Sequence, residues 1–381
     1  MSAAADYIPR PEPAPTEQLI GAHYVPGWKE GTHWGWGKIT PFPGREPLLG
    51  WYDEGRPEVA DWEIKWALEH GISFFAYCWY RKGTGAPVEP RLGHAIHEGL
   101  LQARFRDRFK FCIMWENANA GGVASEQDLF NNLFPFWLDN YFRHPSYLKV
   151  DGKPVLLVYD RNVIVKDLGG AEGVRRALDR MRETCAKAGL GGLWAMCEYR
   201  GAEAKDLQML RDCGFDHAFA YCWHAKSRFP EAAEAVQAQL DKMAKWRDLG
   251  ILPFVPTITC GWDPLPWKQE GPNAASWLVP EKMSRWHLEP ADFESLCRKV
   301  KDLMAGLPAG SLGRRMALLD NWNEWGEGHH LAPHQEHGFG YLDAVRSVFT
   351  SAPREHRDLV PADVGLGPYD SLFRKAQERA K

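Results

Sequence analysis

The sequence contains no apolar stretch long enough to cross a membrane, and its charges are nearly balanced. Its 46 Lys and Arg residues and 50 Asp and Glu residues give a net charge of -4 over 381 residues. A membrane-spanning helix needs about 20 mostly apolar residues, and nucleic-acid binding usually shows as a basic patch. We therefore expect no membrane insertion and no nucleic-acid partner. The oligomeric state is left open.

Motifs of several common chemistries are also missing. The sequence has no Gly-rich phosphate loop, no G-x-S-x-G motif and no HExxH motif, which disfavours nucleotide-driven and serine chemistry. The first residues, MSAAADYIPRPEPAPTEQ, lack the basic segment and apolar run of a signal peptide. We expect a soluble protein, cytoplasmic or, if a signal segment was removed, periplasmic or secreted.

Cysteine is scarce, whereas tryptophan is abundant. The 8 cysteines are not expected to form a disulfide framework in so long a chain. Cys78, Cys112 and Cys222 lie in strand-like runs, so we expect buried free thiols. The 18 tryptophans could fill the core, or their flat faces could stack on sugar rings. Both uses are expected.

Strand-like runs alternate with helical patterns along the chain, which is typical of βα units around a parallel sheet. The runs are QLIGAHYV, ISFFAYCWY, FKFCIMW, PVLLVYD, GLWAMCEY, HAFAYCW, LPFVPTIT and MALLDNW. Eight such units most economically close into a (β/α)8 barrel of the TIM type. A doubly wound open sheet is the alternative.

Helical patterns connect these runs. They cover Pro57 to His70, Ala171 to Ala188, Ala204 to Cys213, Glu231 to Leu249 and Ala291 to Leu307. Four of them are followed by glycine, at Gly71, Gly189, Gly214 and Gly250. Glycine is the usual residue after a helix because it adopts the left-handed conformation that turns the chain.

We expect the barrel to span residues 21–352, after an N-terminal extension at 1–20 and before a C-terminal tail or helix at 353–381. Two loops after strands are long, Trp28 to Glu54 and Gly261 to Pro290. The second loop holds four tryptophans, Trp262, Trp267, Trp277 and Trp286. Loops after strands form the catalytic face of a barrel, so these aromatics could wall a groove.

Polar and aromatic residues recur where the strands end. They are Tyr24, Tyr77, Trp79, Tyr80, Trp115, Glu116, Asn117, Tyr159, Asp160, Glu198, Tyr199, Tyr221, Trp223, Thr257, Asn321, Trp322, Asn323 and Glu324. A strand that only fills a core would end on apolar residues. The pattern therefore favours a site at one mouth of the barrel.

The densest group of polar residues is DNWNEWGEGHH at the end of the eighth strand. Glu324 and Glu327 are separated by a Trp-Gly step that suits a tight loop. Two carboxylates held close in an aromatic pocket do not both ionise readily, so one could act as an acid and the other as a base. Glycoside hydrolysis needs this division. An exposed glutamate pair on a helix is the structural alternative.

Four histidines, His329, His330, His334 and His337, follow the glutamates. Together they invite a metal interpretation, but Pro333 would interrupt any helix that aligned them, and no standard zinc spacing is present. We expect hydrogen bonds to sugar hydroxyls or loop packing instead, and no metal.

Three segments resemble the glycoside hydrolase family 99-like group, which includes endo-α-mannosidases and WbsX-type proteins. They are NEWGEG, WENAN at Trp115 to Asn119 and YLKVDGKPVLLVY at Tyr147 to Tyr159. The resemblance runs from about Gly21 to Phe349 and implies a (β/α)8 barrel. It also implies a retaining mechanism in which Glu324 helps the substrate's 2-hydroxyl attack the anomeric carbon and Glu327 protonates the leaving oxygen.

The chain departs from the family motif just after the glutamates. The endo-mannosidases have threonine, glutamine and an acidic residue where this chain has His329, His330 and Ala332, and WbsX-type members have an acidic residue where Ala332-Pro333-His334 stands. Contacts beyond the cleavage point are therefore expected to differ from those of the mannosidases.

The sequence thus predicts a retaining glycoside hydrolase with an oligo- or polysaccharide substrate, endo-acting and α-mannoside-like, that needs no cofactor. The predicted stacking residues are Trp28, Trp79, Trp115, Trp223 and Trp262, and the predicted hydroxyl contacts are Tyr24, Tyr77, Glu116, Asn117, Tyr159, Glu198, Tyr221, Asn321 and His329. Glu198 and Glu116 have a structural alternative as partners of Arg200 and Lys110. The alternative functions are a glycosyltransferase of surface-polysaccharide assembly and a non-catalytic glycan-binding barrel.

Overall fold

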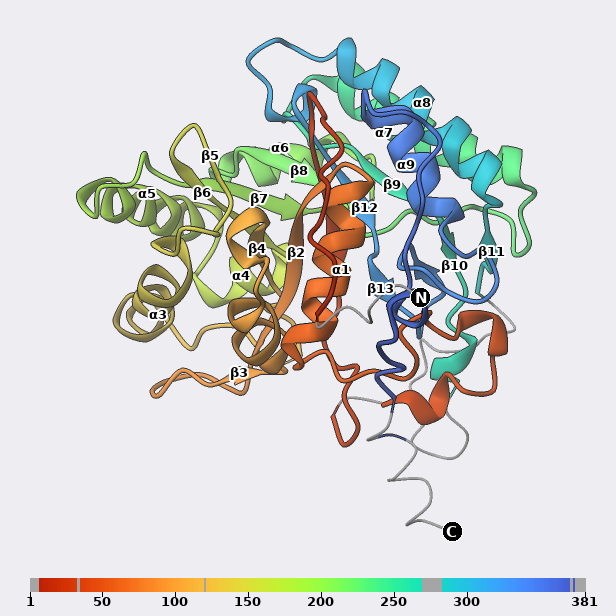
Figure 1. The fold of residues 1–381 in the computed structure, drawn as a ribbon. Coiled ribbons are helices and arrows are strands. Elements are labelled where there is room, and N and C mark those ends of the chain that lie inside the picture. Colours follow the sequence, from red (N-terminus) through yellow and green to blue (C-terminus); the bar gives the residue numbers. More distant parts are fainter. Residues whose placement is uncertain (1–6, 33–34, 120, 269–282, 371–372, 374–381) are drawn as a thin grey trace.

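The computed structural model describes residues 7–32, 35–119, 121–268, 283–370 and 373. Within them, eight parallel strands form one sheet in the order β8-β7-β6-β4-β2-β1-β12-β9 (Figure 1). These strands are β1 (Leu19–Tyr24), β2 (Ile72–Arg81), β4 (Lys110–Trp115), β6 (Lys153–Val158), β7 (Trp194–Glu198), β8 (His217–Phe219), β9 (Thr257–Thr259) and β12 (Met316–Asp320). Each overlaps one predicted run.

The two ends of the sheet meet beside Ala218 of β8. A parallel bridge joins Ala218 to Phe254, just before β9. Ala218 N donates to Pro253 O at 2.8 Å, and Val255 N donates to Ala218 O at 2.9 Å. The strands therefore follow one another around a closed ring, which confirms the barrel and rules out the open doubly wound sheet.

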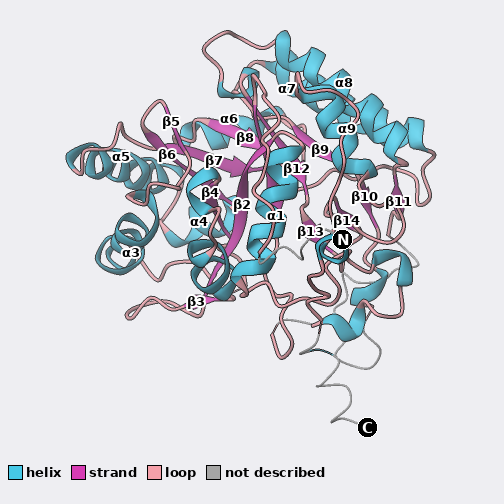
Figure 2. Cartoon of the chain, viewed as in Figure 1, coloured by secondary structure: helices cyan, strands magenta, loops and turns pink. Residues whose placement is uncertain are grey.

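Helices surround the strands (Figure 2). They are α1 (Pro57–Glu69), α2 (Glu126–Asp128), α3 (Phe134–Trp137), α4 (Arg161–Asp167), α5 (Ala171–Lys187), α6 (Ala204–Asp212), α7 (Ala232–Leu249), α8 (Pro290–Ala305) and α9 (Gly340–Phe349). The five predicted helices correspond to α1, α5, α6, α7 and α8. The glycines predicted to end four of them all have positive φ, between 59° and 83°.

The strands are buried on both faces, as parallel strands covered by helices must be. At the end of the barrel where the strands begin, Phe74 fills the interior against Gly21. A Cβ on Gly21 would lie 2.1 Å from Cζ of Phe74, so glycine is required there. The Phe74 ring therefore occupies the interior beside the start of β1. All eight cysteines are buried and free, as predicted.

Short strands extend from the ends of the barrel. β3 (Pro90–Arg91) pairs with β2, β10 (Gly261–Trp262) pairs with β11 (Trp286–His287), and β13 (Asn323–Glu324) pairs with β14 (His329–His330). In Figure 1, β3 is at the lower left and β13 lies below β12, whereas β5 (Lys149–Val150), which precedes β6, is at the upper left. The described parts of both predicted long loops follow barrel strands and are therefore on the face where the strands end. Trp277 lies outside the described residues.

The C-terminal segment packs on α1. Trp66 Nε1 donates to Leu359 O at 2.9 Å, and Trp62 Nε1 donates to the hydroxyl of Tyr369 at 3.1 Å. The only regular element described beyond residue 353 is a short 3-10 turn at Pro361–Val364. Most of the predicted terminal helix, at 371–372 and 374–381, lies outside the described residues.

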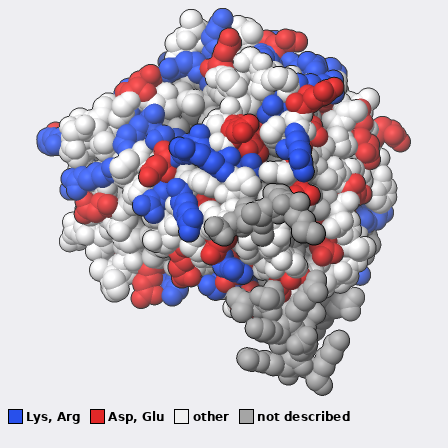
Figure 3. All heavy atoms as spheres, viewed as in Figure 1, with Lys and Arg blue, Asp and Glu red and all other residues white. Residues whose placement is uncertain are grey.

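The surface carries charges of both signs. On the face shown in Figure 3, Asp and Glu side chains lie among the Lys and Arg side chains. Among the helices of the described residues, none is long and apolar enough to cross a membrane.

Candidate active site

The two predicted catalytic glutamates lie on a β-hairpin that follows the last barrel strand. Glu324 is on β13, its partner strand β14 begins at His329, and the turn between them carries Glu327. Gly328 in this turn has a φ of 73°, which glycine adopts without strain. Glu324 is on a strand and only 5% exposed, so the alternative of an exposed pair on a helix is wrong.

Gly326 allows an indole ring to pack against the backbone of the glutamate hairpin. A Cβ at this position would lie 1.8 Å from Cζ2 of Trp267, so only glycine fits. Trp267 comes from the loop after β9, and its ring stacks on Trp28 of the first loop with the centroids 6.1 Å apart. The two long loops therefore meet at the hairpin, and Trp28 lies one ring away from it.

The two carboxyl groups lie in different environments. Burial raises the pKa of Glu324 above its ordinary value, and the negative charge of Glu327 raises it further. The side chain of Glu327 is 18% exposed and lies against a histidine. The environment of Glu324 therefore favours its protonated form.

His329 connects Glu327 to the end of β12. Its Nδ1 lies 2.6 Å from Asp320 Oδ1, and its Nε2 lies 3.0 Å from Glu327 Oε2. Burial lowers the pKa of His329, but the two carboxylates outweigh burial and raise it to about 10. His329 is therefore an imidazolium at neutral pH and can donate to both carboxylates. Both ring nitrogens of His329 contact protein carboxylates. His329 therefore positions Glu327 and has no ring nitrogen free for a sugar hydroxyl.

Three side chains from neighbouring strands lie near the carboxylates. They are Cys78 and Tyr80 of β2 and Tyr221, which follows β8. Burial is the main cause of their raised pKa values, and the negative charge of Glu324 adds to it in all three. Tyr221 was among the predicted sugar contacts. Cys78 and Tyr80 were not.

Other predicted aromatics lie on the outer side of the strands. Side chains alternate along a strand, so Tyr77 and Trp79 point the opposite way from Cys78 and Tyr80. Trp79 Nε1 donates to the hydroxyl of Tyr141 at 2.8 Å. The polar atoms of Tyr24, Trp115 and Trp223 are likewise bonded to Glu63, Gly121 O and Thr257 O. The structure does not bring these five aromatics to the carboxylates.

The fold places the predicted stacking residue Trp262 beside the glutamate hairpin. Its ring centroid lies 5.2 Å from that of His329 and 4.7 Å from that of His224. The next residue, Asp263, donates its backbone N–H to Glu327 O at 2.5 Å. The β10–β11 arm therefore packs directly against the glutamate hairpin.

A cavity of about 470 Å³ opens at the ends of β6 and β7. It is lined by Tyr159, Asp160, Arg161, Asn162, Glu198, Tyr199, Arg200, Gly201, Ala202, Glu203, Asp206 and Lys242. The glutamate pair is not part of this lining, but the negative charge of Glu327 acts on the pKa of Tyr159. Arg200 donates to the hydroxyl of Tyr159 at 2.9 Å and pairs with Glu198, which confirms the structural alternative for Glu198.

Glu116 is a buried carboxyl at the end of β4. Burial, and then the charge of Asp160, raise its pKa to about 7. Its Oε2 has no hydrogen-bond partner among the described residues. The proposed structural partner Lys110 donates instead to Pro145 O, so that alternative for Glu116 is wrong.

The two predicted amides have protein partners. Asn117 exchanges two hydrogen bonds with the backbone of Asp160, at 2.6 and 2.7 Å, and so fastens the end of β4 to that of β6. The amide of Asn321 donates to Asp320 Oδ1 at 2.5 Å. Both amides support the residues around the carboxylates.

The remaining histidines of the cluster pack within the loop. His330 and His334 are buried beside Trp325, with ring centroids 4.4 and 6.2 Å away. Burial lowers both pKa values, that of His334 to about 4. Two groups of described residues could hold a metal ion, and neither contains Glu324 or Glu327: His287, Glu336 and His337; and His70, Asp343 and Asp358.

Sequence reasoning did not select Cys78, and it placed Tyr80 among the strand-end residues and Asp320 in the DNWNEWGEGHH segment without giving either a contact. The alternation of side chains in β2 could have revealed Cys78 and Tyr80, because Phe74, Cys78 and Tyr80 share one face. Asp320 is the last residue of β12, where a charged residue at a buried strand end is unusual. No local signal indicated the contact between Arg200 and Tyr159.

Comparison with known proteins identifies the family. A family model described as glycosyltransferase WbsX matches residues 43–249 and 253–345. Two curated relatives, both called uncharacterized protein WxcX, come from two strains of Xanthomonas campestris pv. campestris. Each is 26% identical over 335 residues, which cover 80% of this chain and 43% of the relative. The chain thus spans less than half the length of these relatives.

Solved structures show the same fold. Two structures of the GH99 endo-α-mannosidase from Bacteroides thetaiotaomicron are similar at 14% identity. The one in complex with bis-tris-propane has a TM-score of 0.61 and covers 96% of this chain and 100% of its own. The other has a TM-score of 0.59 and covers 86% of this chain and 95% of its own. A glycoside hydrolase-like protein gives 0.57 at 17% identity, covering 91% of this chain and 98% of that one. Since the family model covers most of the residues, the chain belongs to the WbsX family of the GH99-like group.

Proposed function

We propose that this protein is a retaining glycoside hydrolase that cleaves an internal or branch linkage of an oligo- or polysaccharide. The observation that carries the proposal is that Glu324 and Glu327 lie on one hairpin at the end of the barrel where the strands finish, with Glu324 buried and Glu327 partly exposed. Glycoside hydrolysis uses such a pair of carboxyl groups, one as base and one as acid. A protein that only binds glycan has no use for it.

The roles follow the resemblance. Glu324, once ionised, accepts the proton of the substrate's 2-hydroxyl as that oxygen attacks the anomeric carbon. Glu327 gives a proton to the leaving oxygen. Its partial exposure suits a group that meets a departing sugar, and the deeper burial of Glu324 suits one that acts within the pocket.

His329 supplies what Glu327 needs for this role. The imidazolium Nε2 lies 3.0 Å from Glu327 Oε2, so a proton can pass between them in either direction. After Glu327 has protonated the leaving oxygen, it is a carboxylate held beside the His329 imidazolium, and it takes up the proton of the water that attacks the anomeric carbon. The bond from the anomeric carbon to the 2-oxygen breaks in that step, and the 2-oxygen takes back the proton held on Glu324. Asp320, on the other side of the ring, holds His329 in place and favours the charged form.

The sugar-binding surface is proposed to include Trp262, Tyr221 and Tyr80 beside the carboxylates and Tyr159 toward the cavity. An α-mannoside-like, endo-cleaved substrate is proposed from the mannosidase neighbours. The cavity at Tyr159 gives room for further sugar units on one side of the cleavage point.

Product release tests the proposal. Wild-type protein and the Glu327→Gln variant are incubated with α-linked mannans and bacterial surface glycans, and fragments are identified by mass spectrometry. We expect defined fragments from the wild type and a loss of about 10²- to 10⁴-fold in the variant, because an acid is removed. Glu172→Gln, an exposed change on α5, serves as the matched control. A Glu327→Gln protein with full activity would contradict the assignment.

The second candidate is a glycosyltransferase. The description of the family model favours it, and so do Arg161, Arg200 and Lys242, which line the cavity and could meet a donor phosphate. However, Arg161 and Arg200 are each paired with a carboxylate, from Asp206 and Glu198. Turnover of a nucleotide-linked or lipid-linked sugar, with no glycan cleaved, would favour the transferase. Tight glycan binding without any turnover would favour the binding barrel.

A further inference from the structure

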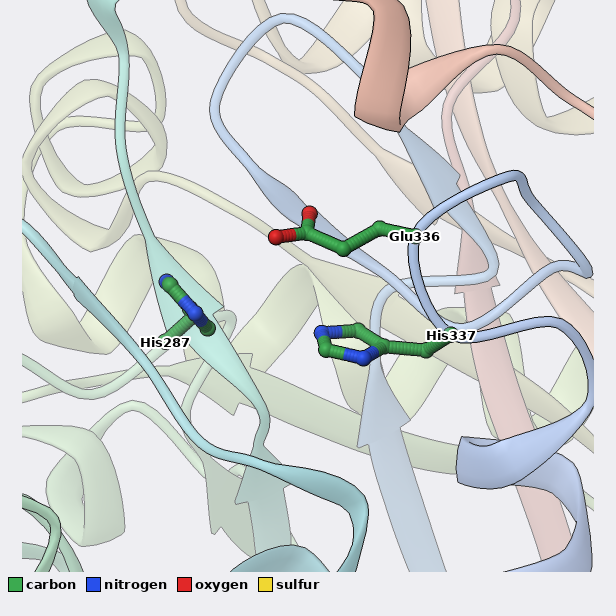
Figure 4. A group of neighbouring side chains, drawn as sticks. All are labelled: His287, Glu336 and His337. Atoms are coloured by element: carbon green, nitrogen blue, oxygen red, sulfur yellow. The ribbon is translucent and has the colours of Figure 1, made fainter.

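A group of metal-ligating side chains lies on the outer side of the β10–β11 arm. His287 of β11 faces Glu336 and His337, which follow β14 (Figure 4). One ligand atom from each residue can be chosen so that all three lie within 4.8 Å of one another. The residues come from segments about 50 positions apart, so only the fold brings them together.

The environment of His337 points to a missing partner. Its side chain is only 10% exposed, and its Nε2 is buried with no hydrogen-bond partner among the described residues. Leaving a buried polar atom unpaired costs about 1–3 kcal/mol, so such an atom calls for an explanation. A bound cation would supply one.

Glu289 offers a possible fourth ligand, a carboxylate oxygen. Glu289 Oε1 lies 3.7 Å from His287 Nε2, and Glu289 Oε2 lies 3.9 Å from His337 Nδ1. Glu289 could therefore ligate the same ion or orient the histidines through their second nitrogens. Such outer partners are usual around metal-bound histidines.

Both sides of the group are anchored by backbone hydrogen bonds. Gln335 N donates to Glu46 O at 2.9 Å, and Glu336 N donates to Gly44 O at 3.0 Å. His287 is held by the pairing of β11 with Gly261 of β10. The backbone on both sides of the group is therefore held in place by hydrogen bonds.

We propose that His287, Glu336 and His337 bind a divalent transition-metal ion, with Zn²⁺ as the representative. Two imidazole nitrogens and one carboxylate oxygen form a donor set typical of zinc. Tetrahedral zinc with bonds of about 2.0–2.2 Å places its ligand atoms about 3.3 Å apart. Because the side chain of His287 is 53% exposed and Glu336 is exposed, both can turn to close the remaining distance.

The ion would link the β10–β11 arm to the turn after β14. The same arm carries Trp262, which packs on His329, and Asp263, which bonds to the backbone of Glu327. The proposed ligands include neither Glu324 nor Glu327, so the role of the ion is structural. The inference does not depend on the proposed hydrolase activity.

The second group, His70 with Asp343 and Asp358, does not compete as a site. His70 Nε2 lies 3.3 Å from Asp358 and 3.7 Å from Asp343, and its Nδ1 is bonded to Trp66 O at 2.6 Å. Burial lowers the pKa of His70, but the two carboxylates outweigh burial and raise it to about 9. An imidazolium must lose its proton before it can bind a metal.

Zinc titration of the full chain, without an affinity tag, tests the proposal. Zn²⁺ is titrated against a chromophoric chelator, and thermal unfolding is recorded with and without Zn²⁺. We expect one equivalent bound by the wild type and a higher unfolding temperature with Zn²⁺. His287→Ala and His337→Ala should each weaken binding by at least about tenfold and abolish the shift, and His144→Ala, remote from the group, should change neither.

Circular dichroism of each variant shows whether it is folded. If His337→Ala unfolds, His287→Ala decides, since the half-exposed side chain of His287 can be removed without opening the core. The proposal is overturned if the wild type binds no Zn²⁺, or if the folded variants keep the wild-type stoichiometry and affinity. The second result would place the ion elsewhere, at His70 or another histidine.

Discussion

At the residue scale, the electrostatics of the site depend on two buried groups, Glu324 and His329, whose neighbours decide where their protons lie. Glu324 is protonated because burial and the charge of Glu327 oppose its ionisation. His329 is charged because two carboxylates hold it. Neighbouring side chains therefore control the protonation of both Glu324 and His329.

The pH dependence of activity follows from these shifts. If Glu324 is the base, kcat/KM rises as the pH rises through the raised pKa of Glu324, because the base must be ionised. The value falls again as His329 loses its proton near pH 10. We therefore expect an optimum on the alkaline side of neutrality. A rate that instead falls steadily from pH 6 to 8 would make Glu324 the acid and reverse the roles.

His329 also makes stability depend on pH. Its pKa in the folded protein is about 10, against about 6.5 when unfolded. Its charged contacts therefore stabilise the fold fully below about pH 6.5 and lose this effect as the pH rises to about 10. In urea unfolding, the stability difference between wild type and His329→Gln should shrink over that range. His144→Gln should show no such trend, and a pH-independent His329→Gln difference would argue against a charged His329.

At the element scale, the ends of the strands are fixed by contacts between separate βα units. Arg81, the last residue of β2, makes two bonds of 2.9 Å to the carboxylate of Asp128 in α2. Burial raises the pKa of Asp128, but Arg81 outweighs burial and holds it well below the ordinary value. This pair ties the loop after β4 to the strand that carries Cys78 and Tyr80.

Removing one partner of this pair should be costly. Asp128→Asn leaves the buried Arg81 without its carboxylate, and breaking a buried ion pair in this way costs about 3–5 kcal/mol. Chemical denaturation measures the loss. The control is Asp139→Asn, which breaks the exposed pair with Arg143 on the same connection and should change stability little. Equal effects in the two variants would contradict the stabilising role of the Arg81 pair.

Strand alternation also explains which predicted contacts were misplaced. In β2 the prediction selected Tyr77 and Trp79, whereas the side chains near the carboxylates are Cys78 and Tyr80. A continuous apolar and aromatic run, as in parallel strands buried on both faces, does not reveal which face points inward. Only the register with neighbouring strands decides it.

At the scale of the whole molecule, the barrel is covered by segments from outside it. We propose that residues 21–352 form the folding unit and that the C-terminal segment stabilises it by covering Trp62 and Trp66 of α1. Both indoles are almost fully buried.

Truncation after residue 352 tests this organisation. We expect the shortened chain to remain folded, with an unfolding temperature lower by at least about 5 °C, since about 1 kcal/mol corresponds to 2–4 °C in a large domain. Calorimetry and tryptophan fluorescence measure the change, and a red shift in emission would report the exposed indoles. A chain that fails to fold would show that the segment belongs to the barrel unit. An unchanged unfolding temperature would show that the covering contributes nothing.

The sequence by itself determined the eight strands, five of the helices between them and the glycines that end four of those helices, because these depend on local hydrophobic patterns and backbone conformation. The helices α2, α3, α4 and α9 were not predicted. The sequence also marked Glu324 and Glu327, since both lie in one short segment. The tertiary structure alone decided which face of each strand turns inward, that His329 holds Glu327, and that His287 meets Glu336 and His337. Some of these contacts join residues that are distant in the chain, and the contact of His329 with Glu327 depends on the register of the hairpin. Barrel closure and loop packing bring these residues together.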